Sequence, residues 1–573
     1  MSQDKSGMRR NLTDYGDADF SLYLRKAFIK AMGYTEEALD RPVIGITNTY
    51  SGYNPCHANV PEIVAAISRG VLLAGGLPIE FPTISLHESF AYPTSMFLRN
   101  LMAMDTEEML RAQPMDTVVL VGGCDKTVPA QLMAAASVNL PAICVVTGPM
   151  LSGSHRGVRV GACTDCRRFW ASYRAGEVDD EEIEEVTNNL VPSGGTCGVM
   201  GTASTIACMT EALGMMLPGG ATIPAVLADR LRHAEAAGTR AVAMAGENLT
   251  PDKILTTSSL ANAMRILLAI GGSTNGIVHL AALAGRLGIE IDYQAFDEMG
   301  RETPVLIDLK PSGNFYMDDL HRAGGLALIF RELKEMLHLD CLTVTGRTLG
   351  EEIERLPLPY TQEVVRSMGN PIHQGGSIAV LGGNLAGEGA IIKQSASSAH
   401  LLVHTGKAVV FDSLQDLSAR IDDPDLDVGP DDVLVMRNAG PRGAPGMPEA
   451  GYIPIPRKLA QQGIKDMVRI SDARMSGTAF GTIVLHACPE AAVGGPLALV
   501  RNGDPITLDV PSRLLTLDVD ETELAQRRTE LAPLKVEKER RGYLRLFHDH
   551  VTQANKGCDF DFLAAPQIRD KTP

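Results

Sequence analysis

The sequence predicts an α/β fold, with a large N-terminal domain over residues 1–375 and a smaller β-barrel-like domain over residues 376–573. With 573 residues, the chain is too long for one ordinary hydrophobic core. Strand-like and helix-like segments alternate up to about residue 370, which favours a mostly parallel sheet with flanking helices. From about residue 376, short strand-like runs follow one another between Gly, Pro and Asp residues, as in a sandwich or a barrel.

In the first domain, apolar runs that end in polar or Gly-containing turns alternate with amphipathic segments. We expect its strands over residues 41–50, 77–85, 116–123 and 140–148. We expect its helices over residues 57–76, 106–115 and 129–139, the last with Pro in its first turn. The acidic run 180–190 is expected to be a further helix with a solvated face.

The second domain is expected to hold few helices. Its strand-like runs are residues 376–383, 404–413, 431–440, 467–474, 481–489, 497–511 and 512–520. A charged helix over residues 521–551 is expected to close the domain.

Charge and composition limit the classes of partner that the protein can have. The formal net charge is −17 and no basic stripe is present, so we expect no nucleic-acid partner, whereas a small anionic substrate stays compatible. The N-terminal residues contain charges without an apolar core, and no apolar run approaches the ~18 residues of a membrane span. We therefore expect a cytoplasmic protein without a membrane partner, whose ten cysteines are free thiols or metal ligands.

Three cysteines share a distinctive setting. Cys56, Cys124 and Cys197 each lie in a turn rich in Gly, Pro or Asn, just before a helical segment. A helix N-terminus favours the thiolate, and such turns present their side chains at the carboxyl edge of a parallel sheet. The three lie about 70 residues apart, unlike the local spacing of ferredoxin motifs, so the fold would have to assemble any cluster. Three thiolates would leave one iron position open, which suits Lewis-acid catalysis rather than electron transfer.

The pair Cys163 and Cys166 forms the single C-x-x-C motif of the sequence. Such a pair is either redox-active or half of a metal site, and no second pair follows at zinc-site spacing.

Hard ligands occur in other turns: Asp125 directly follows Cys124, and Glu88 and Glu449 lie in segments rich in Gly and Pro or directly after a strand. Each acid alone is compatible with an ordinary surface carboxylate, but together they suit an oxygen-rich Mg²⁺ site.

Two further features allow both a functional and a structural interpretation. Residues 269–282 form a Gly-rich turn into a helix, which suits anion binding by backbone N–H groups or plain helix packing. Four histidines lie in loops or at helix starts, where they would donate to a substrate hydroxyl or satisfy buried groups of the protein: His57, His87, His155 and His279.

Several long motifs resemble one family. The segments NPCHAN, GGCDKTVPAQLMAAASVNLPAI, GGTCGVMGTAS, GGSTNGIVHLAA, GPRGAPGMPE and SDARMSGTAFG are similar to those of dihydroxy-acid, phosphogluconate and sugar-acid dehydratases. The resemblance runs from about residue 40 to the end of the second domain and is closest to aldonate dehydratases of the L-arabinonate type. It implies the same two-domain fold and a homodimer or homotetramer.

The resemblance also implies the cofactors and their ligands. It places an iron–sulfur cluster on Cys56, Cys124 and Cys197, with [2Fe–2S] favoured over [4Fe–4S]. It places Mg²⁺ on Glu88, Asp125, Glu449 and a carbamylated Lys126. A carbamate forms only from a neutral amine, so it requires a depressed lysine pKa, and the alternative is an ammonium paired with a carboxylate. The branched-chain amino-acid enzymes of the family have Asp where this chain has Glu88.

The same resemblance implies a reaction. Ser476 would remove the C2 proton of a sugar acid, and loss of the C3 hydroxyl would give a 2-keto-3-deoxy acid. Thr478, Arg474 and His87 are expected to contact the substrate. One alternative is a dihydroxy-acid dehydratase of branched-chain amino-acid biosynthesis. Another is an iron–sulfur sensor or electron carrier, which a fourth ligand such as Cys163 or Cys166 would favour.

Overall fold

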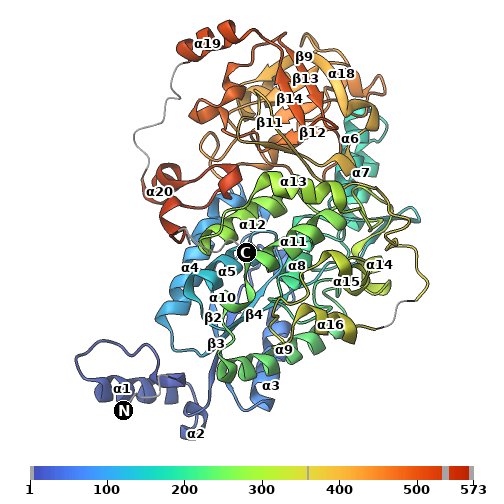
Figure 1. Ribbon diagram of the computed structural model, residues 1–573. Coiled ribbons are helices and arrows are strands. Elements are labelled where there is room, and N and C mark those ends of the chain that lie inside the picture. Colours follow the sequence, from blue (N-terminus) through green and yellow to red (C-terminus); the bar gives the residue numbers. More distant parts are fainter. Residues whose placement is uncertain (1–5, 358–359, 532–540, 567–573) are drawn as a thin grey trace.

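Two β-sheets, one in each half of the chain, organise the fold (Figure 1). The computed structural model describes residues 6–357, 360–531 and 541–566. The N-terminal sheet has the strand order β2-β1-β3-β4 and is parallel throughout. Its strands are β1 Val43–Asn48, β2 Leu77–Pro82, β3 Thr117–Gly122 and β4 Ala142–Val146. All four expected strands are therefore present, and the predicted parallel sheet is confirmed.

The order of these strands places a topological switch point between β1 and β3. The crossovers are α3 Val60–Leu73, from β1 to β2, and α5 Thr127–Val138, from β3 to β4. The first connection runs from β1 outward to β2, and the second runs from β3 outward to β4, toward the other edge of the sheet. Because both connections are right-handed, α3 and α5 lie on opposite faces of the sheet. Open α/β sheets bind ligands outside the carboxyl ends of their strands at such a point.

The helix α9 Ala228–Glu247 packs beside α3. A Cβ at Gly70 would lie 2.0 Å from the Glu235 carbonyl oxygen, so this crossing requires glycine. The helix α4 Arg99–Ala112 packs on α5. We expected this helix over residues 106–115, but Thr106 is buried inside it, and it begins seven positions earlier because the turn Ser95–Leu98 leads directly into it.

The expected alternation of strands and helices is wrong beyond β4. After the hairpin of β5 Gly153–His155 and β6 Val158–Val160, the described residues up to 357 form helices and isolated bridges but no further named strand. These helices were not identified because a helix that is buried on all sides lacks the alternation of apolar and polar residues that identifies an amphipathic helix. In α8, for example, every residue is buried. The helices are α6 Thr164–Ala175, α7 Asp180–Asn189, α8 Thr202–Ala212, α10 Pro251–Ile254, α11 Thr257–Ala269, α12 Asn275–Arg286, α13 Tyr293–Glu302, α14 Met317–Arg322, α15 Leu326–Glu332 and α16 Leu349–Arg355.

The C-terminal sheet has eight strands in the order β14-β13-β9-β10-β11-β12-β8-β7. They are β7 Ala379–Leu381, β8 Ala390–Ile392, β9 Val403–Phe411, β10 Val433–Met436, β11 Arg469–Ser471, β12 Ile483–Leu485, β13 Pro505–Asp509 and β14 Leu514–Leu517. A bridge between Gly382 and Leu514 joins the two outer strands, with the Gly382 N–H donating to Arg513 O at 2.9 Å. This bridge closes the sheet, as the barrel-like prediction requires.

Two details of this half differ from the expectation. The strand β8 was not predicted, because its three apolar residues follow the Gly-rich turn GEG. The central strands β9, β10, β11 and β12 are parallel, and the short helices α17 Leu414–Arg420 and α18 Arg457–Ala460 lie in their connections. The division of the chain at residue 375 stays a prediction.

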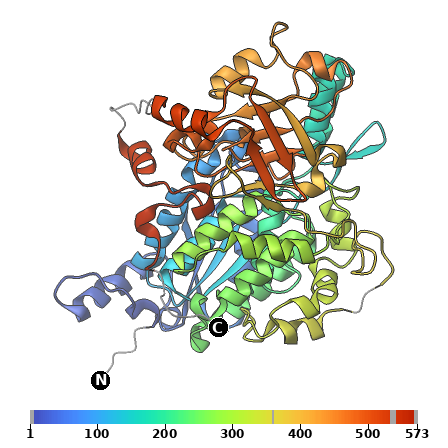
Figure 2. The ribbon, with the colours of Figure 1, turned by 45° about the horizontal axis from the view of Figure 1, so that its top comes forward.

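The C-terminal segment returns to the first half of the chain (Figure 2). The expected helix 521–551 is present as α19 Glu521–Glu530 and α20 Gly542–His550, and residues 532–540 between them lie outside the described residues. Buried Arg99 donates to the carbonyl oxygens of Gly557 and Cys558 at 2.8 and 3.0 Å, which anchors the segment. At the other end, α1 Ala18–Lys30 and α2 Glu36–Leu39 form an arm that projects from the body (Figure 1). In the part of the chain that the structure describes, no helix has the length and apolarity to cross a bilayer.

Candidate active site

The turn between β3 and α5 is fixed by a buried histidine. Nε2 of His57 accepts the backbone N–H groups of Gly123 and Cys124 at 3.0 and 3.1 Å, and Nδ1 lies 2.7 Å from Thr49 O. This pattern fits the neutral ring with its proton on Nδ1. Burial lowers the pKa of His57 to about 4, although the bond to Thr49 opposes the shift. His57 therefore orients the turn, which supports its structural interpretation.

The structure brings the three predicted iron ligands to one place. Cys56 follows β1, Cys124 follows β3, and Cys197 precedes α8, and all three line a cavity of about 920 Å³. The sulfurs of Cys56 and Cys124 lie within 4.8 Å of each other and of a ring nitrogen of His87. The Cys124 thiol and then burial raise the pKa of Cys56, and the charges of Cys197 and Asp125 act in the same direction. This buried thiol set fits a positively charged iron centre.

The C-x-x-C pair also lies on the wall of this cavity. The Cys163 sulfur is 3.6 Å from the Cys197 sulfur, so one of the two cysteines considered above as a fourth ligand lies beside a predicted iron ligand. The Cys166 thiol instead donates to the Cys163 carbonyl oxygen at 2.7 Å, within its own turn. Hydrogen bonds from Cys166 and Cys197 hold the pKa of Cys163 well below its ordinary value.

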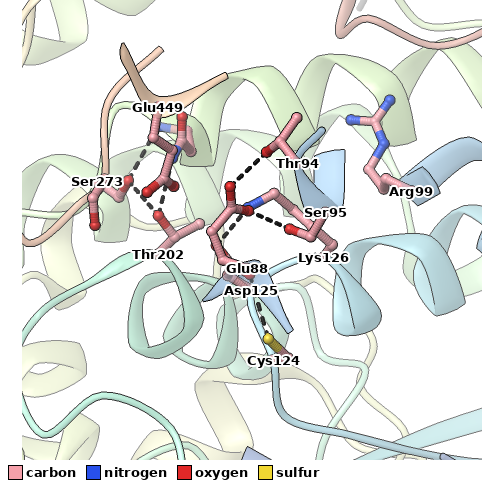
Figure 3. Close-up of polar contacts among 12 residues, drawn as sticks. Glu88, Thr94, Ser95, Arg99, Cys124, Asp125, Lys126, Thr202, Ser273 and Glu449 are labelled. Atoms are coloured by element: carbon pink, nitrogen blue, oxygen red, sulfur yellow. Dashed lines mark hydrogen bonds and ion pairs between the residues drawn. The ribbon is translucent and has the colours of Figure 1, made fainter. Parts of the chain in front are cut away.

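The predicted hard ligands form a second group beside the thiols. Carboxylate oxygens of Glu88, Asp125 and Glu449 lie within 4.8 Å of one another. Glu88 accepts the Thr94 hydroxyl at 2.5 Å and also the Ser95 hydroxyl, as Figure 3 shows. Burial raises the pKa of Glu88, but Arg474 and Lys126 outweigh it and hold this pKa well below its usual range. Three converging carboxylates, one contributed by the C-terminal half of the chain, fit a hard divalent cation.

Two buried cations compensate these carboxylates. Lys126 Nζ lies 2.5 Å from Asp125 Oδ2 and 3.6 Å from Glu88 Oε2, as Figure 3 shows. Burial and Arg474 lower the pKa of Lys126, but the carboxylates of Asp125, Glu88 and Glu449 outweigh them, so this pKa is raised. Without a metal ion, these carboxylates therefore favour the ammonium, whereas carbamylation requires a lowered lysine pKa.

Arg474 lies behind the carboxylates. Its Nη1 donates to Glu449 Oε1 at 2.5 Å, and its Nη2 donates to Thr94 Oγ1 at 2.7 Å and lies 3.3 Å from Glu88. It does not line the cavity, whereas His87 and Thr478 do. Of the three expected substrate contacts, Arg474 is therefore placed to orient ligands rather than to meet a substrate.

The predicted base also lies on the wall of the cavity. Ser476 Oγ is 2.8 Å from Thr478 Oγ1, and both residues line the cavity. Asn275, at the start of α12, donates to Met475 O at 3.0 Å, and a Cβ at Gly477 would lie 2.5 Å from Ser273 Cβ. The segment 269–282 thus packs against the serine loop without lining the cavity, which fits its structural interpretation.

Part of the cavity wall was not identified from the sequence. Arg167 and Trp170 of α6 line it, and the guanidinium of Arg167 lies 4.9 Å from the ring centre of Tyr452. The local signal was CTDCRRFW, in which basic and aromatic residues directly follow the cysteine pair. Such a wall supplies both apolar contact and positive charge to a bound anion.

Sequence profiles show the family to which the chain belongs. The N-terminal profile of the dihydroxy-acid/6-phosphogluconate dehydratases matches residues 41–352, and the C-terminal profile of the same family matches residues 363–558. Together these matches cover most of the chain and both β-sheets.

Individual relatives agree with these profiles. The chain is 46% identical to an L-arabinonate dehydratase of Rhizobium leguminosarum bv. trifolii, over 96% of this chain and 95% of the relative. It is 44% identical to a 6-deoxy-6-sulfo-D-gluconate dehydratase of Pseudomonas putida, over 94% and 93%. It is 40% identical to a dihydroxy-acid dehydratase of Acetivibrio thermocellus, over 93% and 96%. The chain therefore belongs to the dihydroxy-acid/6-phosphogluconate dehydratase family and is a hydro-lyase.

Proposed function

We propose that this enzyme removes water from a sugar acid, an aldonate of the L-arabinonate type, and gives the 2-keto-3-deoxy acid. The observation that carries the proposal is the position of Cys124 and Asp125. These consecutive residues belong to two different donor groups on one cavity, one of Cys56, Cys124 and His87 and one of three carboxylates. Relatives named for L-arabinonate and sulfogluconate support a sugar-acid substrate.

Cys56, Cys124 and Cys197 would hold a [2Fe–2S] cluster, and Glu88, Asp125 and Glu449 would hold Mg²⁺. When bound, these groups supply Lewis acidity to the leaving hydroxyl and to the negative charge that develops on the substrate. The donor types fit, since buried thiols suit iron and converging carboxylates suit magnesium.

Lys126 does not fit beside Mg²⁺ as an ammonium, because the metal ion, the ammonium and Arg474 would place four positive charges against three carboxylates. We include carbamylation of Lys126 in the proposal for this reason. A cation bound to Asp125 and Glu88 would compensate the charges that now raise the pKa of the lysine. The neutral amine would then become accessible, and its carbamate would add an oxygen donor.

Ser476 is proposed to take the proton from C2 of the substrate. A serine hydroxyl is a weak base, so its anion needs stabilisation. Thr478 can provide it, because its hydroxyl lies 2.8 Å from Ser476 Oγ and its backbone N–H donates to the same oxygen at 3.4 Å. Arg474 keeps Glu449 and Glu88 in place from behind the site.

One observation favours a second substrate class, the branched dihydroxy acids. Ile455, Ile464 and Phe480 line part of the cavity and would accept an apolar chain. Glu88 is evidence against this substrate class, because the family resemblance implies that the branched-chain enzymes typically have Asp at this position. The carboxylate group and Ser476 argue against an electron carrier, which needs neither.

The test is anaerobic purification followed by a substrate panel. The panel contains L-arabinonate, other pentonates and hexonates, 6-deoxy-6-sulfo-D-gluconate and a branched 2,3-dihydroxy acid, each scored for 2-keto acid. We expect the highest kcat/KM with a sugar acid. If kcat/KM is highest with the branched acid, the substrate is a branched dihydroxy acid rather than a sugar acid. If no acid gives a product, the proposal is wrong.

A further inference from the structure

A fourth sulfur lies where a ligand of the proposed iron site would lie. Cys163 Sγ is 3.6 Å from Cys197 Sγ, and both cysteines line the cavity that holds Cys56 and Cys124. We infer that Cys163 is a replaceable fourth thiolate ligand of the iron–sulfur cluster in the substrate-free enzyme, on the iron bound by Cys197. The inference rests on the proposed function, because it assumes the cluster on Cys56, Cys124 and Cys197.

The distance fits two thiolates on one iron. Metal–sulfur bonds of about 2.3 Å at a tetrahedral ion place two such sulfurs about 3.8 Å apart. A [2Fe–2S] cluster with four thiolates has two sulfurs on each iron. The described thiols show this arrangement, with Cys56 near Cys124 and Cys163 near Cys197. Two thiols joined by an S–H···S hydrogen bond would have a similar separation, so the experiment must distinguish these two states.

The neighbouring cysteine is not placed for this role. Cys166 also lines the cavity, but its thiol interacts with Cys163, through the carbonyl oxygen at 2.7 Å and through the side chain, whereas the sulfur beside Cys197 is that of Cys163. It has the same chemistry as Cys163, lies three residues away and belongs to the same helix, α6. Cys166 is therefore a matched control within one motif.

The position of Cys163 is coupled to the proposed catalytic loop. Cys163 is the N-cap of α6, and the adjacent Thr164 donates its hydroxyl to Thr478 O at 3.0 Å. Asp165 fixes the same turn, since it accepts Gly161 N–H at 2.8 Å and pairs with Lys310 at 3.0 Å. A substrate that contacts Thr478 would thus act on the turn that carries the fourth sulfur.

The ligation step is balanced without a redox reagent. The S–H bond of Cys163 breaks, its proton goes to water, and a sulfur–iron bond forms with no change in oxidation state. A substrate hydroxyl in this position would reverse the step, and the sulfur would take a proton back from water.

The first measurement compares the iron content and EPR spectrum of dithionite-reduced holoprotein in the wild type and in three variants. We expect Cys197→Ser to lose most of its iron. Cys163→Ser should retain its iron but show shifted g-values, because an oxygen or water replaces the sulfur. Cys166→Ser should match the wild type in both. A wild-type spectrum in Cys163→Ser would overturn the inference.

The second measurement is anaerobic alkylation with iodoacetamide, read by mass spectrometry before and after the iron is removed by chelation. Ligation should slow alkylation of Cys163 about tenfold or more relative to the stripped protein, because a metal-bound sulfur is a poor nucleophile. Cys166 should change much less. Equal protection factors for the two cysteines would contradict ligation by Cys163.

The two proposals fail in different ways. Full iron retention in Cys197→Ser would overturn the cluster assignment itself. Loss of iron there, together with an unshifted Cys163→Ser spectrum, would overturn only the role of Cys163. Nitrogen hyperfine coupling that disappears in His87→Gln would assign the fourth position to His87 instead and would also overturn the inference.

Discussion

Lys126 Nζ lies 2.5 Å from Oδ2 of Asp125, the residue before it in the chain. The carboxylates of Asp125, Glu88 and Glu449 stabilise the ammonium against its burial and the charge of Arg474, so the pKa of Lys126 is raised. The site is thus arranged to compensate its carboxylates with protein cations until a metal ion replaces part of that charge. The first prediction follows from this relationship.

We expect ¹³C-bicarbonate to label Lys126 in the presence of Mg²⁺ and not in its absence, because only the metal compensates Asp125 and Glu88. The measurement is a carbamate resonance in ¹³C NMR. Lys126→Arg keeps the positive charge but cannot form the carbamate, so it serves as the control and should give no resonance. No labelled carbamate in the Mg²⁺-loaded wild type would leave the lysine as an ammonium.

Ser476→Ala should retain iron and magnesium but lose at least about 10³-fold in kcat, because a proton-transfer group is removed without disturbing the ligands. The pair Thr478→Val and Thr478→Ser tests how the base is stabilised. The valine variant loses the hydroxyl 2.8 Å from Ser476, so it should lower kcat while the serine variant does not. Near-normal turnover in Ser476→Ala would show that Ser476 is not the base.

Arg474→Gln should weaken Mg²⁺ binding about 10–100-fold and leave the iron content unchanged, because Arg474 orients Glu449 and Glu88 but touches no thiol group. Isothermal titration of the variant and the wild type with Mg²⁺ measures this difference. Arg437→Gln removes another arginine of the C-terminal half, paired with Asp412 at 2.6 Å, and is the control. Equal affinities in all three proteins would contradict the orienting role.

Trp170 is the single tryptophan of the chain and lines the cavity with 55% of its surface exposed. Binding of a sugar acid should therefore change its emission, since the ligand displaces water from the indole. The titration uses L-arabinonate and the Ser476→Ala variant, in which turnover is prevented. Trp170→Phe should lose the signal but still bind, as equilibrium dialysis would show. An unchanged emission at concentrations that saturate dialysis would place the ligand away from α6.

Lys393 gives a prediction for stability. Its side chain is buried, and its Nζ has no hydrogen-bond partner among the described residues. Burial lowers its pKa from 10.5 to about 7, so between these values the unfolded chain binds more protons and stability rises with pH. Below pH 7 the folded protein contains a charged, buried lysine, which lowers the free energy of unfolding by an amount on the order of a few kcal/mol.

Lys393→Met removes this cost. We expect it to raise the thermal unfolding midpoint at pH 7 and to raise it less at pH 9.5. Lys407→Met, at an exposed position of β9, makes the same charge change without the burial and should shift neither midpoint much. A Lys393→Met protein less stable than the wild type at pH 7 would show that the ammonium has a partner.

The sequence predicted the neighbourhood of Cys56, Cys124 and Asp125 because these residues follow parallel strands, whose carboxyl ends meet at one edge. Residue type and turn setting already grouped Glu449 with the other hard ligands, and the family resemblance assigned it to Mg²⁺. Its distance from them depends on how the two halves of the chain pack. Periodicity did not distinguish α8, which is buried on all sides. The contact between Cys163 and Cys197 arises only from tertiary structure. The homodimer or homotetramer stays a prediction.

The division of the site between the two halves of the chain also orders its maturation. The cysteines of the proposed iron site all lie before residue 200, whereas Glu449 and Ser476 come from the second half. During synthesis, the thiols can therefore gather as soon as the parallel sheet has folded. The carboxylate group is completed only when the C-terminal half packs against the N-terminal half, because Glu449 comes from the C-terminal half. A nascent chain would receive its iron while the cavity is still open, and the later half would then cover the site and supply the base.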